Sequence, residues 1–347
     1  GASFGLTTGC QMAHVTCLAA ARHRVLARRG WDVEADGLAG SPPIGVIVGA
    51  EAHATIATAL GYLGLGRDRA IPVATDGQGR MRLDALEATL PDGDRPLIVC
   101  LQAGNVNTGA FDPMDEICDK ARAARAWVHV DGAFGLCAAA SASTRDLMRG
   151  AEKADSWSVD AHKTLKVPYD SGIVLCRQPE ALVAAMQATG AYLLYSENRD
   201  GMLYTPEMSR RGRALDLWAT IKTVGKSGIE QLVDGLCARA QQLAAEMRAE
   251  GFQVLNEVVF NQVLVTGDTP EQTAAVMARV QRSGEAWCGA GRWHDTPVIR
   301  VSVCSWATTE EDIHRVHGVN ERISINAMHK MAEYFYRLIP RWASSNM

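Results

Sequence analysis

The sequence predicts an α/β fold built around a mainly parallel β-sheet. Short apolar and β-branched runs recur near residues 45, 71, 97, 127, 156 and 172, and helical patterns separate most of them. Strands joined by helices in this order require right-handed crossovers and therefore a mainly parallel sheet. Several of these runs end in polar residues, which places candidate functional groups where open α/β sheets bind ligands.

Composition narrows the class of protein. The chain has 347 residues, of which 47% are hydrophobic and 21% are charged, as in an ordinary globular enzyme large enough for two domains. A formal net charge of −4 gives no electrostatic reason to expect nucleic acid or an anionic membrane as a partner. No apolar run reaches the ~18 residues needed to span a bilayer. We therefore expect a small-molecule substrate.

The nine cysteines are scattered along the chain without a CxxC pair. This pattern favours free thiols in a reducing compartment over a disulfide framework or a zinc site. The start of the chain shows no secretory leader pattern. We therefore expect a cytoplasmic protein without a bound metal.

The first motif spans residues 5–13. A glycine-containing turn precedes a helical pattern over residues 11–29. Free amides at a helix start, together with the helix dipole, favour a phosphate, and Thr7 and Thr8 offer further donors. An ordinary capped helix is the alternative interpretation.

The following elements continue the alternation of strands and helices. Strands are predicted over residues 44–48, 71–74 and 96–101, and helices over 51–63, 83–90 and 114–125. The helix over 51–63 opens with His53. A flat imidazole can stack on an aromatic ring, although a lone histidine at a helix start more often acts as a cap.

Two later strands end in opposite charges. The run 127–131 ends at Asp131, and the run 156–165 ends in a polar tip with His162 and Lys163. A partly desolvated lysine has a lowered pKa, and its free amine can condense with an aldehyde. An aspartate at a buried strand end can keep a ring nitrogen protonated, so this pair suits pyridoxal 5'-phosphate (PLP) held as a Schiff base. A surface lysine and a helix-capping aspartate are the alternatives.

Several motifs in this order resemble one family. The run Asp160-Ala-His-Lys163, followed by Pro168-Tyr-Asp-Ser-Gly172, resembles the group II PLP-dependent decarboxylases, the superfamily of aromatic-L-amino-acid and glutamate decarboxylases. The resemblance implies a PLP-dependent transferase fold of type I, like that of aspartate aminotransferase, with a mainly parallel, seven-stranded sheet. It also implies a large PLP-binding domain over residues 1–225 and a small C-terminal α/β domain over 226–314. Residues 315–347 form an atypical tail of unknown role.

The resemblance implies roles for five residues around the ring of PLP. Lys163 would bind the aldehyde carbon, and Asp131 would pair with the pyridine nitrogen. Ala133 would lie under the ring, and His53 would stack on it. His162 would reach the phosphate or the substrate carboxylate.

The phosphate and the remaining edge of the cofactor would be held by loops. The resemblance implies backbone contacts to the phosphate from Gly9, Cys10 and Gln11. Asn105 follows the strand over 96–101 and stands where many members have threonine, so it is a further cofactor-binding candidate.

A catalytic tyrosine is expected between residues 191 and 213, a segment without periodicity that mixes aromatic and charged residues. In the family, a mobile loop in this region carries a tyrosine that helps to return a proton after carbon dioxide leaves. Tyr204 is the candidate, and Tyr192 and Tyr195 are the alternatives. The basic run 209–213 is interpreted as an ion-paired helix start.

The last part of the chain predicts a smaller unit. A long helical stretch over residues 215–250 is broken near 225–228. Strand patterns follow over 252–255, 258–265 and 298–303.

The family resemblance implies decarboxylation of an L-amino acid, aromatic amino acids among the candidates, to its amine. An aminotransferase or a carbon–carbon lyase is an alternative, because the same electron sink serves those reactions. It also implies a homodimer with the active site at the interface. The chain opens close to a motif that lies well inside the family's sequence, so the N-terminal segment that helps to form the dimer is expected to be absent. A catalytically inactive structural or dimerisation fragment is therefore a further alternative.

Overall fold

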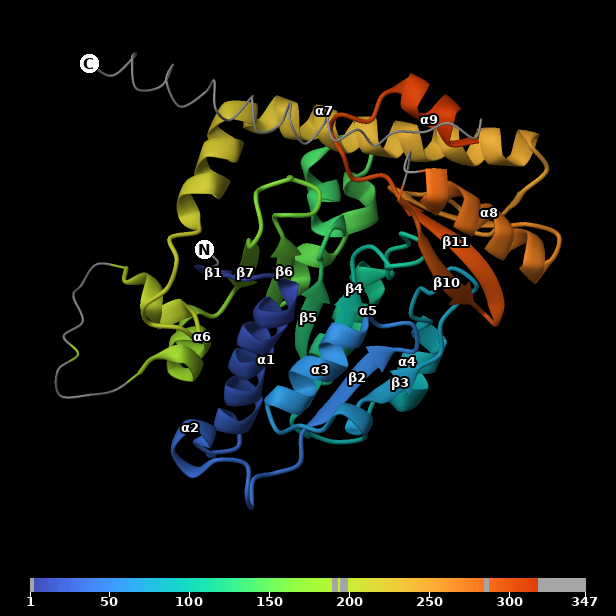
Figure 1. The fold of residues 1–347 in the computed structure, drawn as a ribbon. Coiled ribbons are helices and arrows are strands. Elements are labelled where there is room, and N and C mark those ends of the chain that lie inside the picture. The colour runs from blue at the N-terminus through green and yellow to red at the C-terminus, as the bar shows by residue number, and fades with distance from the viewer. Residues whose placement is uncertain (1–2, 189–192, 194–198, 284–286, 318–347) are drawn as a thin grey trace, which may run out of the picture. The chain divides into compact units, whose positions relative to one another are not determined.

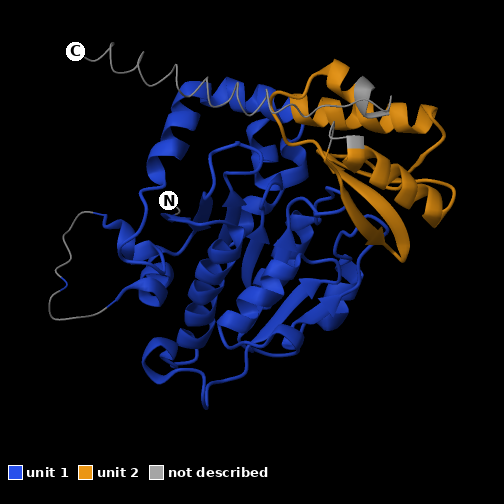
Figure 2. Ribbon diagram, in the orientation of Figure 1, with its two compact units in different colours: residues 1–234 blue, residues 235–347 orange. Residues whose placement is uncertain are grey.

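The computed structural model describes residues 3–188, 193, 199–283 and 287–317 (Figure 1). The chain separates into two compact units, residues 1–234 and 235–347 (Figure 2). Helix α7 (Ala214–Ala249) runs through the boundary between them and also through residue 225, where the sequence predicts a domain boundary. Gly225 is non-helical, with φ 67° and ψ 179°, so the predicted break in this helix is confirmed.

A seven-stranded sheet forms the centre of unit 1, in the order β1-β7-β6-β5-β4-β2-β3. Its strands are β1 (Ser3–Thr7), β2 (Gly45–Gly49), β3 (Ile71–Val73), β4 (Leu97–Gln102), β5 (Trp127–Asp131), β6 (Ser156–Asp160) and β7 (Gly172–Cys176). Strands β3, β2, β4, β5 and β6 are parallel, whereas β7 is antiparallel to both β6 and β1. The predicted mainly parallel sheet is confirmed.

Strand β1 corrects the sequence-based prediction, which placed a turn from Gly5 onwards. Glycine weakens a strand pattern, but here its missing side chain is needed. A Cβ atom on Gly5 would lie 2.5 Å from the carbonyl oxygen of Tyr204, so only glycine lets the two backbones approach this closely. The turn itself is confined to Thr8 and Gly9, just before α1.

The helices of unit 1 connect these strands. They are α1 (Cys10–Ala27), α2 (Val33–Asp36), α3 (Ala54–Tyr62), α4 (Leu83–Thr89), α5 (Met114–Ala123) and α6 (Pro179–Met186). Short 3-10 helices are η1 (Arg67–Arg69), η2 (Gly135–Ala140), η3 (Arg145–Met148), η4 (Ala151–Lys153) and η5 (Gly201–Tyr204). The predicted helices over 11–29, 51–63, 83–90 and 114–125 correspond to α1, α3, α4 and α5.

Helix α1 lies at the centre of the core and packs against α3, α6 and strands β5 to β7 (Figure 1). The side chains that it buries are mostly small, including Ala13, Cys17, Ala20 and Ala21, all fully buried. Small side chains allow a helix axis to approach a sheet closely. The first turn of α1 is therefore held firmly against the carboxyl ends of the strands.

Strand register places the polar strand tips side by side. Gln102 at the end of β4 pairs with Asp131 at the end of β5, and Asp131 pairs with Ser158 in β6. On the other side, a Cβ atom on Gly172 would lie 2.5 Å from the Cα atom of Gly9, so β7 contacts the start of α1 backbone to backbone.

Unit 2 contains an antiparallel four-stranded sheet in the order β10-β11-β9-β8. Its elements are β8 (Gln253–Val254), β9 (Gln262–Thr266), α8 (Pro270–Ser283), β10 (Gly289–Trp293), β11 (Thr296–Ser302) and α9 (Glu310–His317). The sequence did not predict β10, because Gly289-Ala-Gly-Arg has no β-branched residue. Within the part of the chain that the structure describes, no helix is both long and apolar enough to cross a membrane. Most of the tail over 315–347 lies outside the described residues.

Candidate active site

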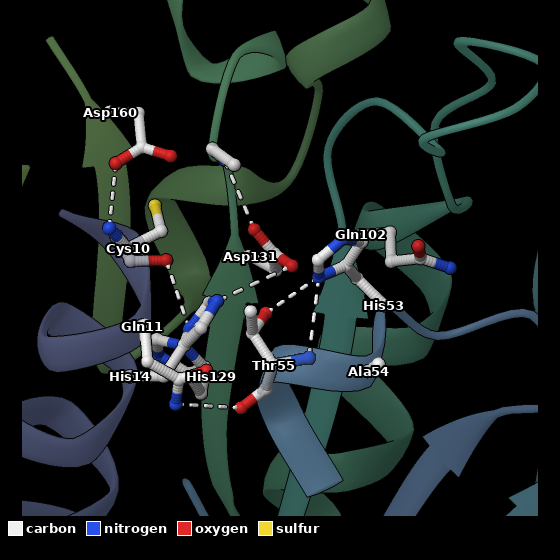
Figure 3. Close-up of polar contacts among 12 residues, drawn as sticks. Cys10, Gln11, His14, His53, Ala54, Thr55, Gln102, His129, Asp131 and Asp160 are labelled. Atoms are coloured by element: carbon white, nitrogen blue, oxygen red, sulfur yellow. Dashed lines mark hydrogen bonds and ion pairs between the residues drawn. The ribbon is translucent and has the colours of Figure 1, made fainter. Parts of the chain in front are cut away.

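Asp131 contacts the second turn of α1 directly, and Lys163 is connected to its first residue through Asp160. Asp131 Oδ2 lies 3.5 Å from His14 Nε2, and Lys163 Nζ lies 3.0 Å from Asp160 Oδ2. The other oxygen of Asp160 accepts a hydrogen bond of 2.6 Å from the backbone N–H of Cys10. Figure 3 shows Cys10, His14, Asp131 and Asp160 around the start of α1.

The carboxylate of Asp131 is held as an anion. It is only 6% exposed, and its Oδ1 accepts the N–H of Ala133 at 3.1 Å. Burial by itself would raise the pKa of Asp131, but the His14 imidazole and the Ala133 amide outweigh burial and lower it. A buried aspartate that stays ionised can hold a proton on a ligand's ring nitrogen.

Two fully buried histidines follow Asp131 in a line of contacts: His14 lies next to its carboxylate, and His129 lies next to His14. His14 Nδ1 lies 3.0 Å from His129 Nε2, with the rings edge to face at 89°. His129 Nδ1 lies 2.9 Å from Ser156 Oγ. Burial, reinforced by His14, lowers the pKa of His129 to about 3, so this histidine is neutral. Sequence analysis assigned no role to His14. Its one signal is the spacing of four residues from Cys10, which places both residues on one face of α1.

The environment of Lys163 corrects the prediction that its pKa is lowered. Burial does act in that direction, but the carboxylate of Asp160 opposes it and raises the pKa of the Lys163 amine. The lysine side chain is 40% exposed, whereas that of Asp160 is 7% exposed. The amine is therefore held as an ammonium group by a neighbour three residues away, which the sequence-based argument about desolvation did not include.

His162 faces the same carboxylate. Its Nε2 lies 3.3 Å from Asp160 Oδ1, and its Nδ1 accepts the N–H of Ser171 at 3.2 Å. The ring stacks on Tyr169, with 4.1 Å between the ring centroids and 22° between their planes. Burial lowers the pKa of His162, which favours its neutral form. Asp160 thus gathers Cys10, His162 and Lys163 around one carboxylate.

The segment predicted to bind phosphate, residues 5–13, forms the end of β1 and the first turn of α1. Gly9 is the N-cap of α1 and contributes no capping side chain. The amide of Cys10, however, already donates to Asp160, and the side chain of Gln11 donates to the carbonyl oxygen of Thr55 at 3.2 Å. Thr7 donates its hydroxyl to the carbonyl oxygen of Gly9 at 3.1 Å.

His53 and Asn105 border the site from the other side. His53 is the N-cap of α3, and its Nδ1 accepts the N–H of Thr55 at 3.3 Å; in the view of Figure 3, Asp131 lies between Cys10 and His53. Asn105 is buried and shapes its own loop: its Nδ2 donates to the carbonyl oxygen of Glu51, and its Oδ1 accepts two amides of the loop.

Gln102 is a further candidate that the sequence did not single out. It lies beside Asp131 in the sheet register and is 5% exposed. Its Nε2 is buried without a hydrogen-bond partner among the described residues. A buried amide with an unused donor is costly, so a ligand that accepts from it would be favoured.

Tyr204, the predicted catalytic tyrosine, lies in η5 with different neighbours. The guanidinium of Arg199 lies 4.2 Å from the centroid of its ring and 4.1 Å from that of Phe4. No hydrogen bond or ring contact within the described ranges joins Tyr204 to Lys163 or Asp131. The alternatives, Tyr192 and Tyr195, lie outside the described residues.

The basic run before α7 is an ion-paired helix start, as predicted. Arg211 pairs with Asp170 and Asp216, and Arg213 pairs with Asp170 at 2.8 Å. These contacts hold the segment that follows Lys163 against the start of α7.

The fold and the site together define a class of protein. A mainly parallel sheet that brings an aspartate and a lysine from successive strand tips to one helix start is the framework expected for PLP enzymes of fold type I. Residues 4–266 match the pyridoxal-dependent decarboxylase conserved domain, and the chain belongs to this family.

Individual relatives agree with this assignment. The chain is 32% identical over 237 residues to the acidic amino acid decarboxylase GADL1 of Homo sapiens, covering 65% of this chain and 46% of that protein. It is 29% identical over 299 residues to an aromatic-L-amino-acid decarboxylase of Bacillus atrophaeus, covering 80% and 62%. The chain thus spans about half the length of the first of these relatives.

A solved structure confirms the predicted fold class. The crystal structure of mouse CSAD in apo form superposes with a TM-score of 0.82 at 25% sequence identity, covering 92% of this chain and 72% of that chain.

Proposed function

We propose that this protein is a PLP-dependent carboxy-lyase that removes the carboxylate of an amino acid as carbon dioxide. Membership of the decarboxylase family supports the reaction. The observation that carries the proposal is that Asp131 and Lys163 are each connected to the first two turns of α1. Asp131 contacts α1 at His14, and Lys163 is linked through Asp160 to Cys10. These two positions are four residues apart, a rise of about 6 Å along the helix, which is comparable with the span of a substituted pyridine ring.

The described residues fit PLP at both ends of its ring. PLP supplies an electron sink when its ring nitrogen is protonated. Asp131 is a buried anion that would hold this proton, and Lys163 would hold the aldehyde carbon. We propose that His53 lies against the ring and that Ala133 lies under it. Ala133 donates its N–H to Asp131, and His53 caps the neighbouring helix α3.

We assign the phosphate to the start of α1, with Gly9, Cys10, Gln11 and His162 as its surroundings. A helix start without acidic residues in its first turn favours an anion. One acidic group does lie close to this helix start, because the carboxylate of Asp160 already accepts the Cys10 amide. A phosphate would therefore meet a like charge there, unless the positive charge of Lys163 and the ring of His162 remain between them.

Asn105 and Tyr204 have weaker support. Asn105 makes the loop beside the site rigid, so we propose that it supports the cofactor pocket. Among the described residues, no contact favours Tyr204 as the proton donor. We propose that a tyrosine of the segment 191–213 has this role.

The substrate proposed is an L-amino acid. The relatives are named for acidic and for aromatic amino acids, so both classes belong in the test. They are all named decarboxylases, and an aminotransferase or carbon–carbon lyase is therefore not favoured.

The cofactor assignment is tested by absorbance. Protein supplied with PLP and freed of excess should keep a visible absorbance band, and Lys163→Ala should abolish it. Lys153→Ala is the matched control, because Lys153 is also a lysine paired with carboxylates, at Asp115 and Asp119. A band that survives Lys163→Ala would contradict the assignment of Lys163. An unsubstituted protein that never forms the band would favour an inactive structural fragment.

The reaction is tested with a panel of aromatic and acidic amino acids. We expect release of carbon dioxide and the matching amine from at least one of them, and no release by Lys163→Ala. Formation of a keto acid without gas would instead identify an aminotransferase.

We further propose that the chain forms a homodimer with the site near the interface. Before the break at Gly225, α7 exposes a large apolar residue at every third position: Leu215, Trp218, Ile221 and Val224. Exposed apolar surface of this kind marks an interface more often than free surface. Tyr169, 74% exposed, stacks on His162 next to Lys163 and would bring the site close to this surface. Sedimentation should show a dimer, and Trp218→Glu should shift it toward monomer; a monomeric unsubstituted protein would contradict the proposal.

The cysteines support a reducing compartment. All nine are free thiols, and seven of them are buried. We therefore propose a cytoplasmic location, which a labelled chain in the source cell would test.

A further inference from the structure

A continuous line of buried polar contacts runs from Trp127 to Asp131. The indole Nε1 of Trp127 donates to Ser156 Oγ at 2.9 Å, and this oxygen lies 2.9 Å from His129 Nδ1. His129 Nε2 lies 3.0 Å from His14 Nδ1, and His14 Nε2 lies 3.5 Å from Asp131 Oδ2. Apart from Asp131, every member is fully buried. Polar groups removed from water have to satisfy one another, so the protons along this line cannot be placed at random.

The first member of the line sets the direction of its protons. An indole N–H can only donate, whereas a hydroxyl can accept one hydrogen bond and donate another. Ser156 can therefore accept from Trp127 and give its own proton to His129 Nδ1. Burial lowers the pKa of His129 to about 3, so this ring carries a single proton, which must then be on Nε2. That proton is donated to His14 Nδ1, and a neutral His14 then carries its proton on Nε2, facing Asp131.

The reverse tautomer of His14 is disfavoured by the same contacts. With its proton on Nδ1, a neutral His14 would turn a bare nitrogen lone pair toward an anionic carboxylate 3.5 Å away. Two acceptors would then face each other in a buried site, where an unsatisfied polar contact is most costly. Ser158 Oγ, 3.2 Å from His14 Nδ1, can also donate to this nitrogen and adds to the preference.

We propose that His14 is a positioning residue for Asp131, fixed in its Nε2–H tautomer by a one-way chain of donors that begins at Trp127. Asp131 is then held at both oxygens: Oδ1 accepts the N–H of Ala133, and Oδ2 faces the Nε2–H of His14 at 3.5 Å, a charge contact longer than an ordinary hydrogen bond. Such a carboxylate cannot rotate freely, and each of its oxygens keeps a second lone pair. The role of this fixed carboxylate rests on the proposed function, since Asp131 would pair with the ring nitrogen of PLP.

The tautomers are measured in cofactor-free protein by NMR of 15N-labelled histidine side chains, with His14→Gln and His129→Gln to assign the signals. In both rings, we expect Nδ1 to show the shift of an unprotonated nitrogen and Nε2 that of a protonated one. A proton on Nδ1 of His14, alone or together with Nε2, would overturn the proposal. Because no cofactor is present, this result is independent of whether the protein binds PLP.

The origin of the tautomer is tested with two matched serine variants. Ser156→Ala breaks the line, so we expect both histidines to lose their single tautomer and PLP to bind several-fold more weakly. Ser158→Ala removes only the side branch and should leave the tautomers unchanged. If Ser158→Ala alters the tautomer of His14 and Ser156→Ala does not, the chain from Trp127 is not what fixes this residue.

The consequence for the cofactor is tested at His14 itself. We expect His14→Phe to weaken PLP binding roughly tenfold in an absorbance titration, the lower end of the range for a lost polar contact with a charged group. His14→Gln, whose amide can still donate, should recover part of the loss. Equal affinity in all three proteins would overturn the positioning role, and the serine pair decides the question if His14→Phe fails to fold by circular dichroism. Failure of the unsubstituted protein to bind PLP would count against the proposed function alone.

Discussion

Replacing Asp160 by asparagine should lower the pKa of the Lys163 amine, because the charge that holds its ammonium form is removed. The variant keeps the shape of the side chain and an oxygen for the Cys10 amide, but it removes the charge 3.0 Å from Lys163 Nζ. At an effective dielectric constant of about 20, two charges at this distance attract by about 5 kcal/mol, and in bulk water by about 1 kcal/mol. Because the Lys163 side chain is 40% exposed, solvent screening leaves about 2 kcal/mol of this attraction.

The assay is NMR of 13C-methylated lysines across a pH titration of the cofactor-free protein, with Lys163→Arg to identify the signal. Asp84→Asn is the control, because that carboxylate is exposed and pairs only with a nearby surface arginine. Burial then acts on Lys163 unopposed, and its pKa should fall below the value in the unsubstituted protein. An unchanged pKa of Lys163 would refute the claim that Asp160 holds the ammonium form. We also expect faster PLP uptake at neutral pH, since more of the amine is unprotonated and a carboxylate no longer opposes the phosphate.

Three further predictions concern stability. Burial holds the pKa of His129 at about 3, against 6.5 for an exposed histidine, so the unfolded state binds a proton first as the pH falls. The free energy of unfolding should therefore decrease below pH 6.5, by about 2 kcal/mol at pH 5. Urea unfolding of His129→Gln should depend less steeply on pH, and an equal pH dependence would contradict this. Asp112 should affect the free energy of unfolding in the opposite direction with pH. Burial raises the pKa of Asp112 to about 6, although its carboxyl group accepts two backbone amides. The stability that it contributes is therefore complete below pH 3.8 and is lost as the pH rises through 6. Asp112→Asn should therefore cost about 1–3 kcal/mol at pH 4.5 and less at pH 8, and a loss that grows with pH would count against the assignment. Gly172→Ala should lower the free energy of unfolding by about 1–3 kcal/mol, because its Cβ atom would press on the backbone at the start of α1. Gly77→Ala is the control, since open space surrounds Gly77 and its thermal midpoint should not change. Equal midpoints for the two variants would argue against the close contact at Gly172.

The sequence by itself determined the layout of the sheet and the two strand tips. Strand and helix periodicities are local, so the parallel strands, α1 and the positions of Asp131 and Lys163 at strand ends could be predicted without coordinates. The family resemblance carried PLP and decarboxylation beyond what periodicity can show. Strands β1 and β10 were missed, because both contain glycine, which is depleted in strands and weakens a strand pattern.

Only the tertiary structure decided the electrostatics of the site. Cys10 and Asp160 are 150 residues apart in sequence, and His14 and His129 are 115 apart, yet each pair is in hydrogen-bond contact. Desolvation and Coulomb attraction depend on distances of a few ångströms between such residues, and no local spacing encodes them. This is why the pKa of Lys163 is raised where desolvation alone predicted a decrease, and why His14 emerged as the neighbour of Asp131 only when α1 was packed onto the sheet.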